Sequence, residues 1–178
     1  MKLKELIAQQ GQRIEKAKGE HVFMQGEKSR SFYYVESGLL KAYYVSGEGQ
    51  EYIKSFLLPG GFIGSISALF DDGSASFSLV CLAPSTLHAI SFETLKQHSA
   101  NDLELANRLI DLLIQLAMKK ERREYEFLCL SAEERFRLLQ DSEPSLLDKV
   151  TQNDLARYLG ITPVGLSRIK KRVNNPQA

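Results

Sequence analysis

The segment from Thr151 to Arg172, TQNDLARYLGITPVGLSRIKKR, restricts the fold of this chain more than any other stretch. Thr151 has the hydroxyl of a helix N-cap, and Asp154 follows at the third helical position, as in a capping box. Gly160 stands where the first helix must end, because glycine tolerates the left-handed backbone that closes many helices. Thr162 and the proline after it form a second start signal. The segment is therefore predicted to fold as two short helices joined by a tight turn.

Apolar residues occupy one face of each predicted helix in this segment. They are Leu155, Ala156 and Leu159 on the first helix and Leu166 and Ile169 on the second. Because alanine is small, it allows the two helices to cross closely at a steep angle. Two helices in this arrangement, joined by a short turn with a glycine, form the helix-turn-helix of DNA-binding proteins.

Basic side chains are concentrated in the same part of the chain. Between Thr151 and Ala178 five basic residues stand against one acidic residue, a net charge of +4, whereas the whole chain carries only +1. The five are Arg157, Arg168, Lys170, Lys171 and Arg172. Clustered arginine and lysine beside a helix-turn-helix are typical of a surface that binds a phosphate backbone. The alternative for this segment is an ordinary helical hairpin with a solvated basic end.

The composition is that of a folded soluble protein. Apolar residues make up 43% of the 178 residues and charged residues 25%, which allows one domain or two small ones with a real core. The longest apolar run, residues 109–118, is interrupted by Asp111 and Gln115, so no membrane span is expected. The N-terminal residues contain no apolar signal-peptide core, and the expected compartment is the cytoplasm. Cys81 and Cys129 are too few for a disulfide framework or a four-thiolate site, and each is expected to be buried.

Residues 19–91 have the pattern of a β-domain. Frequent glycines separate short runs rich in aromatic and β-branched residues, which is typical of antiparallel strands in a sandwich or jelly roll. The runs are HVFM, SFYYVES, LLKAYYVS, EYIKSFLL, FSLVCL and TLHAIS. The glycines in SGEG predict a hairpin between residues 39–46 and 50–58. A helix is predicted within residues 1–18, and a brief helical turn at residues 69–73.

A long helix is predicted from Asn101 to about Phe127, after a short one at residues 91–99. Its first half is apolar on nearly every side and needs two partners, one of which is the β-domain. Its second half, KKERREYEF, is expected to be a solvated stalk. Four leucines match the spacing of a coiled-coil seam and predict the same helix of a second subunit as the other partner, with burial inside one monomer as the alternative. These leucines are Leu105, Leu109, Leu112 and Leu116.

The order of these parts resembles the Crp/Fnr family of bacterial transcription regulators. GEHVFMQGEKSRSFYYVESGLLKAYYV is similar to the family's opening strands, PGGFIGSISAL to its phosphate cassette, and DLARYLGITPVGLSRIKKR to its helix-turn-helix. The resemblance covers almost the whole chain and implies an α+β fold. It has a cyclic-nucleotide-binding-like antiparallel β-roll at residues 1–100, a long dimerisation helix at 101–128 and a helix-turn-helix domain at 129–178, which a capping box from Ser131 to Glu134 is expected to open. The implied activity is sequence-specific DNA binding by a homodimer, with RNA polymerase as a further partner.

The phosphate cassette departs from the pattern of the members that bind cyclic nucleotides. Those members carry a carboxylate after the glycine of this loop and an Arg–Ser pair further on, where this chain has Ser65 and the pair Ala75–Ser76. Without the arginine a buried phosphate lacks its counter-charge, so the effector is expected not to be cAMP. The loop either holds an unidentified small polar ligand or contains serines that only serve turns and strands. The candidate pocket residues are Gly64, Ser65, Ile66, Ser67 and Ser76.

Other sensor chemistries have no support in the sequence. An iron–sulfur cluster needs four thiolates, and the chain has two cysteines. A haem needs an axial ligand, and His21, His88 and His98 are expected to be structural or surface residues. No catalytic set, metal-ligand cluster or phosphate-binding glycine loop is evident, so neither an enzyme nor a metal or cofactor is expected. The rival interpretation is a module that binds a small ligand or a protein, with a helix-turn-helix that is only structural.

The second helix of the helix-turn-helix is predicted to enter the major groove. Arg168 is expected to make a bidentate contact to guanine, because its guanidinium matches O6 and N7. Ser167 is expected to contact a base or a phosphate, and Val164 a thymine methyl group. The predicted phosphate contacts, which set the register on DNA, are Arg157, Thr162, Lys170, Lys171 and Arg172. Few residues follow Arg172, so the hairpin wing of many family members is not expected.

Overall fold

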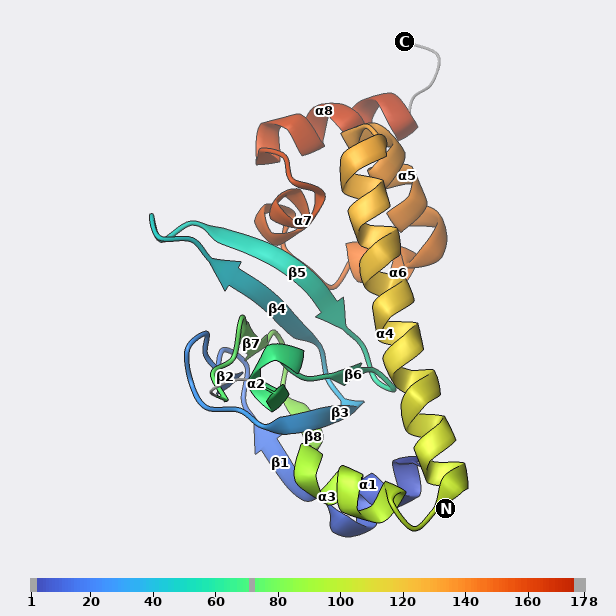
Figure 1. The fold of residues 1–178 in the computed structure, drawn as a ribbon. Coiled ribbons are helices and arrows are strands. Elements are labelled where there is room, and N and C mark those ends of the chain that lie inside the picture. The colour runs from blue at the N-terminus through green and yellow to red at the C-terminus, as the bar shows by residue number, and fades with distance from the viewer. Residues whose placement is uncertain (1–2, 71–72, 175–178) are drawn as a thin grey trace. The chain divides into compact units, whose positions relative to one another are not determined.

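The computed structural model describes residues 3–70 and 73–174 of the chain. They form two compact units that meet between Ile114 and Gln115, inside helix α4 (Leu103–Cys129). The first unit contains the strands, and the second contains the C-terminal helices (Figure 1). The expected boundaries near residues 100 and 128 set the long helix apart, whereas here each unit includes part of it.

Two antiparallel sheets of four strands make up most of the first unit, in agreement with the predicted β-roll. In one sheet the order is β1 (Gln12–Lys16), β8 (Ser85–Ser91), β3 (Ser31–Ser37) and β6 (Phe62–Ile63). In the other it is β2 (His21–Phe23), β7 (Ser78–Cys81), β4 (Leu40–Val45) and β5 (Glu51–Leu57). The predicted hairpin is present as β4 and β5, which form the long ribbon in Figure 1.

The N-terminal segment differs from the single helix predicted within residues 1–18. Helix α1 covers Leu3–Gln10, and the edge strand β1 follows at Gln12–Lys16. Strand β1 pairs with β8, and its Ile14 packs against the core opposite Leu87. The charged sequence QRIEK does not have the pattern of a strand. Its extended backbone depends instead on hydrogen bonds to a strand about 70 residues away.

The two short helices of the first unit lie close to their predicted positions. Helix α2 covers Ile66–Phe70, so it begins three residues before the turn predicted at residues 69–73. Asp71 and Asp72 of that prediction lie outside the described residues. Helix α3 (Phe92–Ser99) confirms the short helix predicted before the long one.

Helix α4 begins one residue later than predicted. Its cap is Asp102 rather than Asn101, because the Oδ1 of Asp102 accepts a hydrogen bond from the N–H of Leu105 at 3.0 Å. This hydrogen bond is the main reason that the pKa of the Asp102 carboxyl lies below its usual value. Like the other helices in the described ranges, α4 is not both long and apolar enough to cross a lipid bilayer.

Apolar side chains fill the first unit. Phe23 lies against Tyr33 and Phe77, with ring centroids 5.5 and 5.3 Å apart. Cys81 is buried in the same core, as predicted, whereas Cys129 at the end of α4 is exposed, so the prediction of its burial is wrong. The aliphatic residues around the aromatic cluster are Val35, Leu40, Ala42, Leu57, Ile63, Leu79 and Leu87.

Helices α5 (Ala132–Ser142), α6 (Pro144–Leu147), α7 (Gln152–Leu159) and α8 (Pro163–Asn174) form the second unit with the end of α4. The predicted capping box is complete at α5, because Ser131 Oγ accepts from the N–H of Glu134 and Glu134 Oε2 accepts from the N–H of Ser131. Helices α5, α7 and α8 contact one another. The buried residues of α5 to α8 and of the linker between α6 and α7 are Phe136, Leu139, Leu146, Val150, Leu155, Ala156, Leu159, Leu166 and Ile169.

Gly38 is a position where a side chain is expected to disturb the roll strongly. Its φ is +101°, and an added Cβ would stand 2.1 Å from Ser85 Oγ and 2.7 Å from the carbonyl oxygen of Pro84. Gly38→Ala is expected to lower the free energy of unfolding by about 2–4 kcal/mol, through backbone strain and overpacking. Gly19→Ala is the matched control, since its φ of +87° has nothing within 4 Å of the added Cβ. Urea denaturation compares the variants, and equal losses would contradict the role of crowding.

Candidate nucleic-acid interface

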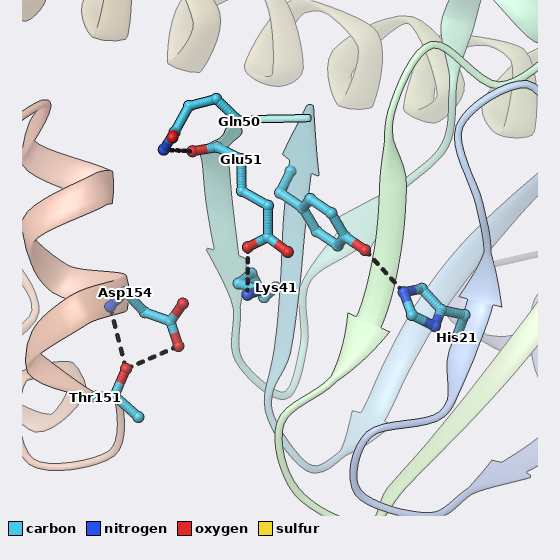
Figure 2. A network of polar contacts seen from close by, with 7 residues as sticks. His21, Lys41, Gln50, Glu51, Thr151 and Asp154 are labelled. Carbon is cyan, nitrogen blue, oxygen red and sulfur yellow. Dashed lines mark hydrogen bonds and ion pairs between the residues drawn. The ribbon is translucent and has the colours of Figure 1, made fainter. Parts of the chain in front are cut away.

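Helix α7 begins at the predicted cap, with one change in its hydrogen bonds. The Oγ1 of Thr151 accepts from the N–H of Asp154 at 3.1 Å, as predicted. The same hydroxyl donates to Oδ2 of Asp154 at 3.0 Å (Figure 2). The predicted capping box has the carboxylate on the backbone N–H of the cap instead, as Glu134 does at Ser131. Aspartate is one methylene shorter than glutamate, which accounts for the difference.

The turn after α7 closes around Gly160, as predicted. Its φ is +70°, in the left-handed region. The N–H of Gly160 donates to the carbonyl of Arg157 at 3.2 Å, and the N–H of Ile161 donates to that of Ala156 at 3.0 Å. These two bonds form a Schellman motif, which satisfies the last carbonyls of the helix and turns the chain toward α8.

Helix α8 starts at the predicted Thr–Pro signal. The Oγ1 of Thr162 accepts from the N–H of Gly165 at 3.1 Å, which leaves this hydroxyl engaged in capping the helix. Leu166 and Ile169 are buried against the rest of the unit. Both the two-helix arrangement and its apolar contact face are therefore as predicted.

The opposite side of α8 is solvent-exposed and carries the predicted base-reading residues. Val164, Ser167, Arg168 and Lys171 are exposed and follow an i, i+3, i+4, i+7 spacing, so they form one stripe along the helix. We call these four residues the reading face. It combines a guanidinium, an ammonium, a hydroxyl and an apolar side chain, which are the groups that base edges and phosphates can bind.

Two of the other predicted phosphate contacts, Arg172 and Lys170, lie near side chains of α5. The Nη2 of Arg172 lies 3.2 Å from Oε2 of Glu133. Lys170 is half-buried, and its Nζ lies 6.0 Å from the ring centroid of Phe136. Arg157 is exposed on α7. Lys171 is thus the basic residue that the structure brings to the same face as Arg168, and the assignment of phosphate contacts stays a prediction.

The second half of α4 is not the solvated stalk that the sequence predicts. Arg123 is half-buried, and its Nη2 donates to the carbonyl oxygen of Tyr158 at 2.5 Å. Arg135 of α5 donates to the carbonyl of Leu159 at 3.0 Å through Nη2. Sequence reasoning missed both arginines because a cation within a charged run carries no signal of burial. The aromatic residue four positions after Arg123, Phe127, is the one available hint.

In the first unit, three of the predicted pocket residues come together. Ser65 is fully buried, and its Oγ lies 3.1 Å from Ser67 Oγ and 3.2 Å from Ser76 Oγ. It also accepts from the N–H of Ser76 at 3.0 Å. Ile66 is exposed, and Gly64 lies so close to Phe32 that an added Cβ would stand 2.9 Å from its Cδ1. The partners of Ser65 are Ser67 in α2 and Ser76 just before β7, which favours a structural role.

Ala75, which is predicted to occupy the position of the family's phosphate-binding arginine, is part of the apolar core. Its N–H donates to the carbonyl of Glu27 and its carbonyl accepts from the N–H of Gly26, both at 2.8 Å. A cyclic phosphate requires a positive charge and hydrogen-bond donors. The side chain of Ala75 supplies neither.

The strand histidines have polar partners. The Nε2 of His21 lies 2.8 Å from the hydroxyl of Tyr43 (Figure 2). The Nε2 of His88 lies 2.9 Å from Oε2 of Glu36. Lys41, which sequence reasoning did not single out, is buried on β4 with its Nζ 3.3 Å from Oε2 of Glu51 (Figure 2). Within residues 3–70 and 73–174, no three His, Cys, Asp or Glu residues are grouped so that they could hold a metal ion.

Two of the four leucines in the predicted dimer seam on α4 are covered by their own chain. Leu105 and Leu109 are only 1% and 9% exposed in the single chain, so they are not available to a second subunit. A different row of apolar residues, spaced by seven and then four positions, points to solvent. It consists of Leu103, Ile110, Ile114 and Met118, which we call the α4 stripe. Because α4 is apolar on nearly every side, its sequence period does not reveal which side its own chain covers.

Comparisons with known proteins agree with this architecture. Residues 13–102 match the cyclic nucleotide-binding domain family. The fumarate and nitrate reduction regulatory protein of Escherichia coli K12 is 26% identical over 166 residues, covering 87% of this chain and 66% of the relative. The chain thus spans about two thirds of the length of this relative.

Two solved structures share the fold. FixK2 of Bradyrhizobium japonicum has a TM-score of 0.76 at 18% identity, covering 93% of this chain and 85% of that one. The c-di-GMP responsive global regulator CLP of Xanthomonas campestris has a TM-score of 0.76 at 22% identity, covering 98% and 91%. A β-roll followed by a long helix and a helix-turn-helix therefore defines the class of this protein. The chain belongs to the cyclic nucleotide-binding domain family, and its fold is that of the Crp/Fnr proteins.

Proposed function

We propose that this protein is a sequence-specific DNA-binding transcription regulator. The observation that carries the proposal is the reading face of α8, where Val164, Ser167, Arg168 and Lys171 point away from the buried Leu166 and Ile169. A helix presented in this way fits the major groove, with its first residues toward base edges. Its two basic side chains supply attraction to phosphate and the means to recognise guanine.

The regulator acts as a homodimer through the α4 stripe. Leu103, Ile110, Ile114 and Met118 lie along one side of a helix about 40 Å long, and a second copy of this helix is the partner that would cover them. A two-fold dimer presents two reading helices, and family members of this kind read half-sites about one DNA turn, ~34 Å, apart. RNA polymerase is the further partner that family membership implies.

The effector is not a cyclic nucleotide. Ser65 stands where a carboxylate would hold the ribose, and Ala75 where an arginine would neutralise the phosphate. Ser65 is occupied by hydrogen bonds to Ser67 and Ser76. A buried anion at this loop would therefore lose its hydration without gaining a counter-charge.

A salt titration of DNA binding tests the proposed function. A dimer with about 6–10 phosphate contacts is expected to lose roughly 10³–10⁵-fold in affinity between ~50 and ~200 mM salt. Selection from a random DNA library is expected to enrich a two-fold symmetric sequence. A flat salt dependence together with no enriched sequence would exclude the regulator and leave a ligand-binding or protein-interaction module.

Thermal unfolding tests the proposal about the effector. Because Ala75 offers no counter-charge, saturating cAMP is expected to leave the melting temperature unchanged. The positive control is the selected DNA, which binds the folded state and is expected to raise the melting temperature. A clear rise with cAMP would contradict the proposal.

A further inference from the structure

Arg123 lies in an unusual position for a residue of a charged helical run. Its Cζ is 3.7 Å from the ring centroid of Tyr158 and 4.5 Å from that of Phe127, so the guanidinium is held between two aromatic rings. Its Nη2 donates to the carbonyl oxygen of Tyr158. Burial lowers the pKa of Arg123, yet an arginine stays charged at any physiological pH. A charge half-removed from water is retained only where its contacts compensate.

Arg135 makes a second connection in the same place. Its Nη2 donates to the carbonyl of Leu159 at 3.0 Å, and its Nη1 to that of Leu130 at 2.6 Å. The Cζ of Arg135 lies 4.7 Å from the ring centroid of Phe127. One guanidinium therefore joins the end of α7 to the residue that follows α4. The planar fork of arginine is suited to such directional contacts, whereas the ammonium of lysine is not.

The carbonyls that these arginines bind lie at helix C-termini, which attract cations. Tyr158 and Leu159 are the last two residues of α7, directly before the turn into α8. Gly160 in that turn fits closely against α4, because an added Cβ would stand 2.8 Å from Cε1 of Phe127. The direction of α7, and with it the direction of the reading helix, is thus defined relative to the end of α4.

We propose that Arg123, Phe127 and Arg135 form a clamp that orients the reading helix on the dimer helix and thereby sets the spacing of the DNA half-sites. The inference rests on the proposed dimeric DNA-binding function. Each clamp residue is a positioning residue, since it acts on DNA only through α7 and α8. Apolar side chains would hold α7 against α4 equally well, whereas four charge-assisted contacts to backbone carbonyls hold it at one angle.

Half-site spacing provides a test that loss of stability alone would not imitate. A half-site is first selected from a DNA library, and pairs of it are then separated by spacers of varied length. The unaltered protein is expected to prefer one spacing over spacings two base pairs longer or shorter. Arg123→Ala is expected to reduce that preference about tenfold while leaving binding to a single half-site unchanged. The reason is that the variant loosens only the orientation of the two reading helices relative to each other.

Arg122→Ala is the matched control, because it removes the same charge from the neighbouring residue. Arg122 is exposed, and its Nε is paired with Glu126 one turn further along α4. This variant is expected to keep the full spacing preference. Arg123→Lys keeps the charge and removes the planar fork, and it replaces the alanine variant if that protein does not fold. Unchanged spacing preference in the Arg123 variant, or equal losses on single and paired half-sites, would overturn the clamp.

Failure of the proposed function has a different outcome. If the protein binds no DNA at any spacing, the proposed function as a transcription regulator is refuted. Amide hydrogen exchange of the full chain then tests whether the clamp exists. The N–H groups of Gly160 and Ile161 are expected to exchange at least tenfold faster in Arg123→Ala than in Arg122→Ala. Equal exchange in the two variants would overturn the clamp without reference to DNA.

Discussion

Replacing Ile114 with glutamate is expected to convert the proposed homodimer into a monomer. Ile114 is 51% exposed in the middle of the α4 stripe, and a two-fold dimer brings the same region of both helices together. Ile114→Glu would place like charges in an apolar seam, where their desolvation is not compensated. Sedimentation velocity measures the dissociation. Affinity for DNA with two half-sites is expected to fall by about 10²–10⁴-fold, because the second half-site contact is no longer intramolecular.

Gln115→Glu is the matched control for this variant. It adds the same charge at the next residue, which is also exposed but lies off the α4 stripe. Gln115→Glu is expected to remain dimeric and to bind DNA normally. A dimeric Ile114→Glu protein would contradict the proposed seam, as would dissociation of both variants to the same degree.

Arg168→Ala is expected to weaken binding to the selected DNA by about 1–3 kcal/mol in each half-site, or roughly 2–6 kcal/mol for the dimer. The loss of affinity is expected to come from one base pair in each half-site. The variant is then expected to discriminate less between the four possible base pairs at that position. The physical reason is that a guanidinium on the reading face can donate two hydrogen bonds to one guanine, which alanine cannot replace. Binding titrations against DNA with each base pair varied in turn measure both effects.

Lys171→Ala separates base reading from charge. Lys171 lies on the same exposed face but is expected to contact phosphate. Its replacement is expected to weaken selected and random DNA about equally and to reduce the salt slope by about one for each half-site. Identical losses on selected and random DNA for both variants would show that Arg168 reads no base.

The helix-turn-helix was predictable because its signals are local. The caps at Thr151 and Thr162, the stop at Gly160 and the positions of Leu155 and Leu166 each act within a few residues, and the structure confirms all of them. The hairpin of β4 and β5 is local in the same sense. Strands β1 and β6 were not predicted. Their partners β8 and β3 are distant along the chain, and no short-range sequence pattern indicates the pairing.

The candidate site residues also fall into those that local sequence patterns predict and those that depend on tertiary contacts. The reading face follows from the helical period once α8 is known, so Arg168, Ser167 and Val164 were accessible from the sequence. The burial of Arg123 and the role of Arg135 were not, because both depend on carbonyls of α7 that come near only in the folded unit. Neither residue differs by type from the exposed arginines around it.

The amino-acid sequence by itself determined the fold class of this protein and the helix that we propose to read DNA, because turn chemistry and helical periodicity are properties of short segments. Tertiary structure alone decided which side of α4 remains free. Leu105 and Leu109 are covered by their own chain, while Ile110 and Ile114 are left to solvent, although all four are equally apolar in the sequence. The physical reason is that hydrophobic burial depends on area removed from water, and that area exists only after distant segments have packed.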